Sequence, residues 1–154
     1  LSLKSSSNFN PMEKQPGSAL GVFDAGISLH QLVNNLVNES LSTAYHNKTH
    51  IVNEVARDFV LGKDNESVIT VIRDLLAATI FNSSKGQIHI SAERYNDVLI
   101  LMIEERNNNN GFALSFSIGS IEPEAARAGG HISIEGARNK RTLISFSFPV
   151  KFAA

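Results

Sequence analysis

One stretch near the middle of the chain constrains the fold most, because it places a long amphipathic helix directly before a β-hairpin. Over residues 65–82 the apolar side chains recur every three or four positions, which is the spacing of one helix face. Asp64 or Asn65 can cap the start of this helix. Residues 87–94 then alternate between apolar and polar side chains, and residues 98–103 are apolar on both faces. The hairpin therefore contributes a half-buried strand and a strand from the middle of a sheet.

A second amphipathic helix is predicted nearer the N-terminus. Ser28 and Gln31 have the spacing of a capping box. Apolar residues follow at helical intervals at Leu29, Leu32, Val33, Leu36, Val37, Leu41, Ala44 and Tyr45. We expect one continuous helix that buries this face.

The remaining segments add strands and one more helix. Four segments have the pattern of strands or extended chain, namely residues 51–56, 59–61, 131–137 and 142–148. Residues 112–118 are compatible with either a strand or a short buried helix. A helix over residues 121–128 would carry Pro123 in its first turn and Gly129 at its C-terminal cap.

The predicted order is helix, strand, helix, two strands, helix, two strands. Hairpins joined by helices favour a mixed β-sheet with the helices packed on one face. We therefore expect an α/β (α+β) fold of the two-layer sandwich type. Residues 1–27 are rich in Ser, Asn, Pro and Gly, so we interpret them as a flexible tail or linker and residues 28–150 as the domain.

The composition limits the size of the fold and the class of partner. The chain has 154 residues, 42% of them hydrophobic and 19% charged, which suits one domain with a real core. A net charge of −1 and a pI near 6.6 give no attraction to nucleic acid or to an anionic membrane. Cysteine is absent, no secretory leader is recognisable, and no apolar run approaches the roughly 20 residues that cross a bilayer. We expect a cytoplasmic domain without nucleic-acid or membrane contact.

Three short sequences carry a resemblance to a known family. Residues 74–83 read DLLAATIFNS, residues 129–135 read GGHISIE, and residues 142–149 read TLISFSFP. They resemble the ATP-binding domain of sensor histidine kinases, the GHKL or HATPase-like family, whose helix reads Asn-Leu-Leu-x-Asn-Ala-Ile-Lys-Phe-Thr. The resemblance covers residues 28–150 and implies a histidine-kinase-ATPase-like sandwich.

The resemblance also implies that the helix has lost polar groups that serve ATP. In the family, the second Asn of the helix gives an oxygen ligand to the magnesium ion that bridges the ATP phosphates. Ala78 stands at that position and offers no oxygen, and Phe81 replaces a Lys that would lie near phosphate. Asp74 stands at the first Asn position and is the residual metal ligand, if there is one. An ordinary Asp beside Arg73 on a polar helix face is the simpler interpretation.

Two glycine-containing boxes of the family align with changed residues. The Asp of an Asp-x-Gly-x-Gly box accepts a hydrogen bond from the adenine amine, and Glu105 stands nearest to it, with no glycine until Gly111. A Gly-x-Gly-Leu box cradles phosphate at a helix start, and its glycines fall by position on Ser115 and Ser117. The lid between these boxes would be only a few residues long. The resemblance therefore implies a vestigial nucleotide site at Asp74, Ala78, Glu105, Gly111, Ser115 and Ser117.

Three histidines invite other chemistry. His46 and His50 are four residues apart, as two metal ligands on one helix face would be, but no third ligand is evident and we interpret them as exposed side chains. His30 could be a phosphoacceptor. Histidine kinases present that residue in a His-Glu or His-Asp context, whereas Gln31 follows here. We favour neither interpretation.

We interpret the sequence as a degenerate histidine-kinase-type ATPase domain that acts as a signalling or docking module in two-component-like signal transduction, without nucleotide turnover. The expected partner is a response regulator or a kinase, and no cofactor is expected. The alternative is the ATP-binding catalytic domain of a divergent sensor histidine kinase, which would bind Mg-ATP and transfer phosphate to a His in an upstream domain. A small-molecule binding domain that reuses the vacated pocket is a third interpretation. Whether this domain is an enzyme stays open.

Overall fold

The computed structural model describes residues 26–62, 64–107, 111–137 and 141–150. A short antiparallel pair is formed by β3 (Ile27–Ser28) and β5 (Val60–Leu61). The main sheet contains β4 (His50–Asn53), β6 (Gln87–Tyr95), β7 (Val98–Arg106), β8 (His131–Ala137) and β9 (Arg141–Pro149). The helices are α2 (Leu29–Glu39), α3 (Leu41–His46), α4 (Glu66–Phe81), α5 (Gly111–Gly119) and α6 (Glu122–Arg127).

The main sheet is mixed, with the strand order β4-β6-β7-β9-β8. β4 runs parallel to β6, and the other three pairs are antiparallel. β7 lies at the centre, as its apolar residues on both faces predict. In the hairpin from β6 to β7, Tyr95 pairs with Val98, and Asn96 takes a left-handed φ of 54° that asparagine tolerates.

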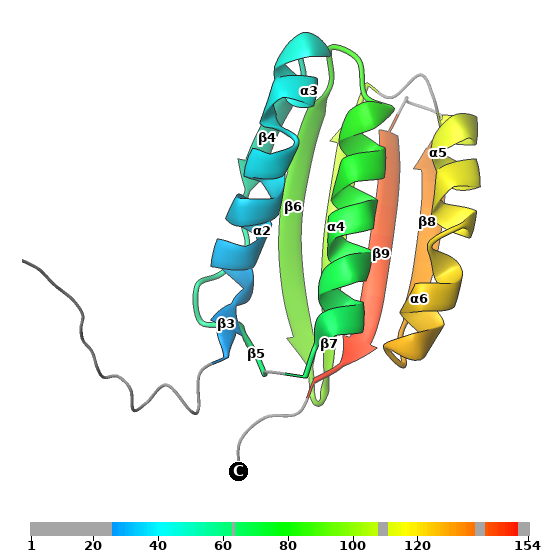
Figure 1. The fold of residues 1–154 in the computed structure, drawn as a ribbon. Coiled ribbons are helices and arrows are strands. Elements are labelled where there is room, and N and C mark those ends of the chain that lie inside the picture. Colours follow the sequence, from blue (N-terminus) through cyan, green and yellow to red (C-terminus); the bar gives the residue numbers. More distant parts are fainter. Residues whose placement is uncertain (1–25, 63, 108–110, 138–140, 151–154) are drawn as a thin grey trace, which may run out of the picture.

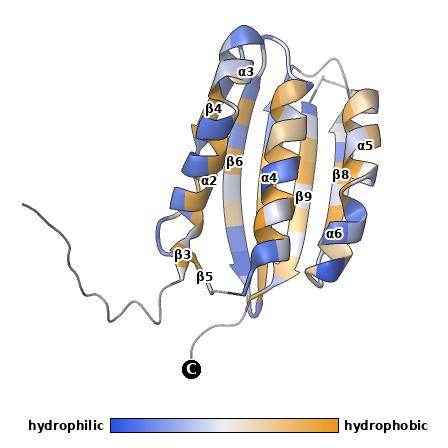
Figure 2. Ribbon diagram, in the orientation of Figure 1, coloured by the Kyte–Doolittle hydropathy of each residue, from blue (hydrophilic) through white to orange (hydrophobic). Residues whose placement is uncertain are grey.

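The helices lie on one face of the main sheet, with α4 in the middle between α2 on one side and α5 and α6 on the other (Figure 1). The surfaces of α2 and α6 that are turned away from the sheet carry hydrophilic residues (Figure 2). The core between the layers includes fully buried aliphatic side chains of α4 and the rings of Phe146 and Phe148, whose centroids are 4.7 Å apart. The expected two-layer α/β sandwich, with a mixed sheet and helices on one face, is confirmed.

The prediction of one continuous first helix is wrong, because the chain breaks between α2 and α3. Ser40 separates them at φ −108° and ψ 15°, and its backbone N–H donates to Val37 O at 3.0 Å. The break turns the apolar stripe away from the sheet. As a result Leu41 and Tyr45 are 56% and 87% exposed, and Ala44 is the residue of α3 that is buried.

The start of α2 has half of the predicted capping box. Ser28 Oγ accepts a hydrogen bond from the Gln31 backbone N–H at 3.3 Å. The Gln31 side chain does not complete the box, since it donates to Asn35 Oδ1 at 2.9 Å, one turn further along the helix.

The ambiguous segment at residues 112–118 is helical and forms most of α5. The next helix, α6, ends as predicted. Gly129 has a φ of +74°, its N–H donates to Ala126 O at 2.9 Å, and the Gly130 N–H donates to Ala125 O at 2.8 Å. These two bonds form a Schellman motif, which only a residue that tolerates positive φ completes without strain.

The chain outside this sandwich is described only in small part. The predicted tail, residues 1–27, lies outside the described residues except for its end, where Ile27 pairs with Leu61. Among the described residues, no helix combines the length and the apolar character that crossing a bilayer requires.

Candidate functional site

The residues that the resemblance assigns to nucleotide contacts belong to α4, β7 and α5. The C-terminal end of α4, the end of β7 and the start of α5 meet at one end of the sandwich, at the top of Figure 1. The chain passes from Arg106, the last residue of β7, to Gly111, the first residue of α5, through only residues 107–110. Four residues are too few to form a long lid over a nucleotide.

The position that the resemblance assigns to a magnesium ligand lies on α4. Ala78 is half-buried, and its methyl group packs against the hydrophobic core. Asp74 lies one turn earlier and is exposed. Arg73 beside it pairs with Glu39 of α2, with Nε 3.4 Å from Oε1, which ties α4 to its neighbour helix. This face of α4 therefore offers a single surface carboxylate to a cation.

Glu105 is the residue of the candidate site with the most unusual surroundings. It is the second-last residue of β7, is 0% exposed, and neither carboxylate oxygen has a hydrogen-bonding partner among the described residues. Burial raises the pKa of the Glu105 carboxyl to about 7, and the nearby Ser83 hydroxyl opposes this rise only in part. At neutral pH a large share of this carboxyl is therefore protonated.

Two buried or half-buried hydroxyl groups, those of Ser83 and Thr49, lie at the same corner as Glu105, and the sequence did not predict them. Thr49 Oγ1 donates to Ser83 Oγ at 2.8 Å, and Ser83 is only 2% exposed. A Cβ added to Gly86 would lie 2.7 Å from Ser83 Oγ and 3.1 Å from Glu105 Oε2, so both groups crowd that glycine. The alternation of side chains along β7 does predict the direction of Glu105. It lies four residues after the buried Leu101, so both side chains point to the same, inward face of the strand.

The backbone two residues after Glu105 has a left-handed conformation. Asn107 stands here, where the family's adenine box has its first glycine, and its φ is 66°. Asparagine tolerates this left-handed conformation better than other residues that have a side chain. Asn107 Nδ2 also donates to Lys85 O at 3.1 Å, which joins this corner to the turn after α4.

Ser115 and Ser117 do not lie at a helix start. They are the fifth and seventh residues of α5, where Ser115 is exposed and Ser117 is half-buried. Only the first four N–H groups of a helix lack partners within it, so the backbone at these serines cannot cradle a phosphate. Of the residues predicted to contact nucleotide, Gly111 is the one that lies at a helix start, as the first residue of α5.

The three histidines singled out in the sequence lie in unrelated surroundings. His30 is 9% exposed, and its Nδ1 donates to Val55 O at 2.7 Å, which makes it a buried link between α2 and the chain after β4. His46 ends α3 and His50 begins β4, so the two do not share a helix face. Within the described residues, no group of three or more His, Asp or Glu side chains could hold a metal ion.

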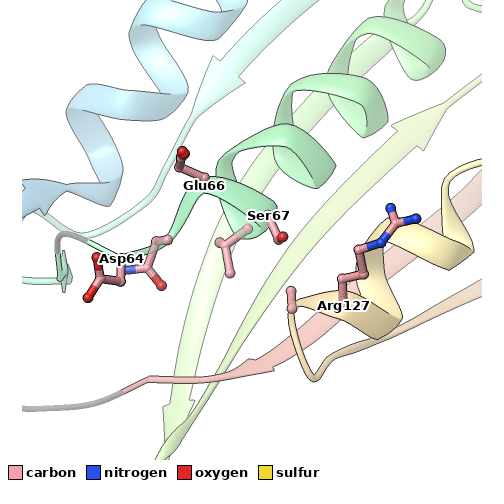
Figure 3. A pocket seen from close by; sticks show the side chains of 7 residues that line it. Asp64, Glu66, Ser67 and Arg127 are labelled. Carbon is pink, nitrogen blue, oxygen red and sulfur yellow. The ribbon is translucent and has the colours of Figure 1, made fainter.

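A cavity of about 330 Å³ lies at the other end of α4, between the start of that helix and the end of α6 (Figure 3). Ser67 on α4 and Arg127 on α6 lie on its two sides, and Arg127 pairs with Glu124 at 2.6 Å. The pKa of Glu124 is lowered first by its hydrogen bond with Ser67 and then by Arg127, and together these outweigh the opposing effect of burial. This cavity is separate from the residues that the resemblance assigns to nucleotide contacts.

Comparisons with known proteins find relatives by structure and not by sequence. No family model matches the sequence, and no curated protein matches it. Among solved structures, the histidine kinase AdeS of Acinetobacter baumannii superposes with a TM-score of 0.67 at 13% identity, over 83% of this chain and 68% of AdeS. The nucleotide-free catalytic domain of histidine kinase ThkA superposes with a TM-score of 0.63 at 16% identity, over 82% of this chain and 96% of that domain.

Two further similar structures contain bound partners. Full-length ShkA in complex with AMPPNP gives a TM-score of 0.68 at 12% identity, over 84% of this chain and 32% of ShkA. ThkA in complex with the response regulator TrrA gives a TM-score of 0.61 at 17% identity, over 82% of this chain and 42% of that ThkA chain. The described part of this protein therefore has the fold of histidine kinase catalytic domains. The sequence identities are so low that its chemistry must be argued from its own residues.

Proposed function

We propose that this protein is a degenerate histidine-kinase-type ATPase domain that works as a signalling or docking module in two-component-like signal transduction, without nucleotide turnover. The observation that carries the proposal is Ala78, a half-buried aliphatic residue at the position where the family places an oxygen ligand for magnesium. Without that ligand, the phosphates of ATP lose the cation that neutralises and orients them.

Two more features support a domain that does not hydrolyse ATP. Ser115 and Ser117 lie inside α5, where their backbone N–H groups are used by the helix. The connection from β7 to α5 is limited to residues 107–110, which leaves no long lid to exclude water from a reacting phosphate. A preserved sandwich with these losses is suited to presenting a surface to another protein.

The partner class that we propose is a response regulator or a kinase. ThkA, which has the same fold, forms a complex with the response regulator TrrA. The net charge of −1 on this chain gives no electrostatic preference for nucleic acid, so a protein partner remains the expected one.

Titration calorimetry with ATP and with ADP, each with and without magnesium, tests the proposal. We expect no heat of binding at millimolar nucleotide. Magnesium-dependent binding of ATP at micromolar affinity would overturn the proposal, because it would mean that the phosphate and metal contacts work despite Ala78.

One observation favours a second candidate, the ATP-binding catalytic domain of a divergent sensor histidine kinase. Glu105 is a buried carboxyl without a hydrogen-bonding partner among the described residues, at the position of the family's adenine-binding Asp. Under this alternative Glu105 would contact adenine and Asp74 would hold magnesium. A longer protein that includes an upstream histidine-bearing domain should then form phosphohistidine from labelled ATP, and Glu105→Gln should abolish the labelling. Absence of labelled phosphohistidine in the unsubstituted protein would exclude this candidate.

A further inference from the structure

The corner where α4 ends contains a buried polar cluster, which we call the Glu105 cluster and define as Thr49, Ser83, Gly86 and Glu105. Thr49 donates to Ser83 Oγ, which leaves the Ser83 hydroxyl hydrogen available for a second contact. The space that a Cβ on Gly86 would need is occupied by Ser83 Oγ at 2.7 Å and by Glu105 Oε2 at 3.1 Å. The carboxyl group is therefore packed tightly against the turn that follows α4.

Glu105 enters this cluster from the centre of the sheet. Its cross-strand neighbours are Ile88 on β6 and Thr142 on β9, and both are buried. Neither oxygen of Glu105 has a hydrogen-bonding partner among the described residues. A carboxylate held in such a place is disfavoured relative to a neutral carboxyl group, because a buried charge needs a counterion or strong donors.

Among the described residues, no charged group on the surrounding elements supplies a counterion to Glu105. On β7 itself Glu104 and Arg106 alternate to the opposite face, where both Arg106 and Arg141 of β9 bind Glu104. His89 on β6 is half-buried, but it pairs in register with Glu104 and so alternates to the face opposite Glu105. The remaining charged or titratable residues described on the neighbouring segments are exposed: Tyr45, His46, Lys48, His50, Asp74 and Lys85. Burial, offset in part by the Ser83 hydroxyl, is what acts on the Glu105 carboxyl.

The turn that covers Glu105 is itself tied to two other segments. The His50 N–H donates to Gly86 O at 3.0 Å, and the Lys85 N–H donates to Asn47 O at 2.8 Å. The Asn107 side chain donates to Lys85 O at 3.1 Å. A displacement of this turn would therefore be transmitted both to β4 and to the connection that leads into α5.

We propose that release of the Glu105 proton to solvent loosens the turn at residues 83–86 from the end of β7, so that this corner has two states that are selected by pH. In the protonated state the neutral carboxyl packs against Gly86 and Ser83 as the structure shows. In the ionised state the carboxylate needs donors or water, and the turn must move to admit them. This inference does not depend on nucleotide binding or on the proposed docking function.

Nuclear magnetic resonance of the whole protein tests the inference without any ligand. The side-chain carboxyl carbon of Glu105 and the backbone amides of residues 83–86 would be followed between about pH 3 and about pH 9. We expect the carboxyl carbon and the turn amides to titrate together, with a shared midpoint of about 7. A carboxyl midpoint near the ordinary value of 4.5, or turn amides that do not shift while the carboxyl titrates, would overturn the inference.

Three variants separate Glu105 from its neighbours. Glu105→Gln keeps the shape of the side chain without its proton equilibrium and should remove the shift of the turn amides. Glu104→Gln, on the other face of the same strand, should leave the shift in place. His50→Gln should also leave it, which excludes titration of the imidazole of the residue whose backbone N–H binds Gly86 O. If Glu105→Gln does not fold, the carbon titration of the unsubstituted protein decides the question alone.

Discussion

Single residues decide what the candidate site can do. Ala78 acts through the identity of its side chain, and Glu105 acts through its surroundings. Ala78 has no side-chain oxygen to offer a cation, so its effect can be argued from the side chain alone. Glu105 retains a carboxyl, but its surroundings change the protonation of that group. Its parity within β7 predicts that it points inward, whereas the contacts with Ser83 and Gly86 come from a turn that is distant in sequence.

The buried carboxyl should make stability depend on pH. The pKa of Glu105 is raised from 4.5 to about 7 in the folded protein, so the folded state binds the proton more tightly than the unfolded chain. Its contribution is therefore fully present below pH 4.5 and is lost as the pH rises through about 7, a loss of roughly 3 kcal/mol at about 1.4 kcal/mol per pKa unit. Urea unfolding at a series of pH values measures this loss.

Glu105→Gln should flatten that dependence and should be more stable than the unsubstituted protein above neutral pH. Glu104→Gln is the control. Burial acts to raise the pKa of Glu104, but hydrogen bonds from Arg141 and Arg106 outweigh it and the pKa is lowered, so Glu104 contributes stability that is lost toward acid. An unchanged pH profile in Glu105→Gln would contradict this account.

Gly86→Ala should be clearly destabilising. Its Cβ would meet Ser83 Oγ at 2.7 Å and the backbone oxygen of Arg106 at 3.1 Å, and the second of these cannot rotate away. We expect a loss of about 1–3 kcal/mol, typical of overpacking, measured by urea unfolding. Gly119→Ala at the end of α5 is the matched control, since nothing lies within 4 Å of its added Cβ and its stability should change by less than about 1 kcal/mol. Equal effects of the two substitutions would show that the packing at Gly86 is not tight.

Elements were predicted well where a pattern is local and less well where a boundary depends on neighbours. The predicted hairpin of β6 and β7 and the predicted end of α6 are both confirmed. The patterns that predict them, apolar–polar alternation and a glycine at position 129, are confined to a few consecutive residues. The break at Ser40 was missed. The helical spacing of apolar residues continues from α2 into α3 across Ser40, so the sequence does not mark a break. Only the packing of the short α3 shows that Tyr45 faces solvent.

The C-terminal end of α4 depends on a side chain from another element. Asn47, which follows α3, donates from Nδ2 to Ile80 O at 3.0 Å and to Phe81 O at 3.3 Å, two carbonyls of the last helical turn. Ile80 O also accepts the Ser83 backbone N–H at 3.2 Å. Asn47→Ala should cost about 1 kcal/mol in urea unfolding. Asn35→Ala, which removes an exposed contact within α2, should cost less than half of this. A neutral Asn47→Ala would mean that water replaces the amide without loss.

At the scale of the whole molecule, the main sheet carries its helices on a single face, and no described helix covers the other face. Leu101 and Ile100 are consecutive residues of the central strand, and they distinguish the two faces: Leu101 is 0% exposed beneath the helices, whereas Ile100 is half-buried on the other face. Because the described helices share this one core, the domain should unfold as a single unit.

Leu101→Ala should therefore cost about 2–5 kcal/mol, and Ile100→Ala, its matched control, distinctly less. In both variants circular dichroism and the fluorescence of Tyr45 and Tyr95, which lie on α3 and β6, should report one coincident transition. Two separated transitions would contradict the single core, and equal costs would contradict the difference between the faces.

The sequence by itself determined the sandwich, the central place of β7 and the absence of an oxygen ligand at position 78, because periodicity, turn chemistry and side-chain identity are local properties. Tertiary structure alone decided that Ser115 and Ser117 lie inside a helix, that His30 is a buried hydrogen-bond donor, and that Glu105 shares a corner with Ser83 and Gly86. The physical reason is that burial, and with it the pKa of a carboxyl group, depends on which distant segments pack against it.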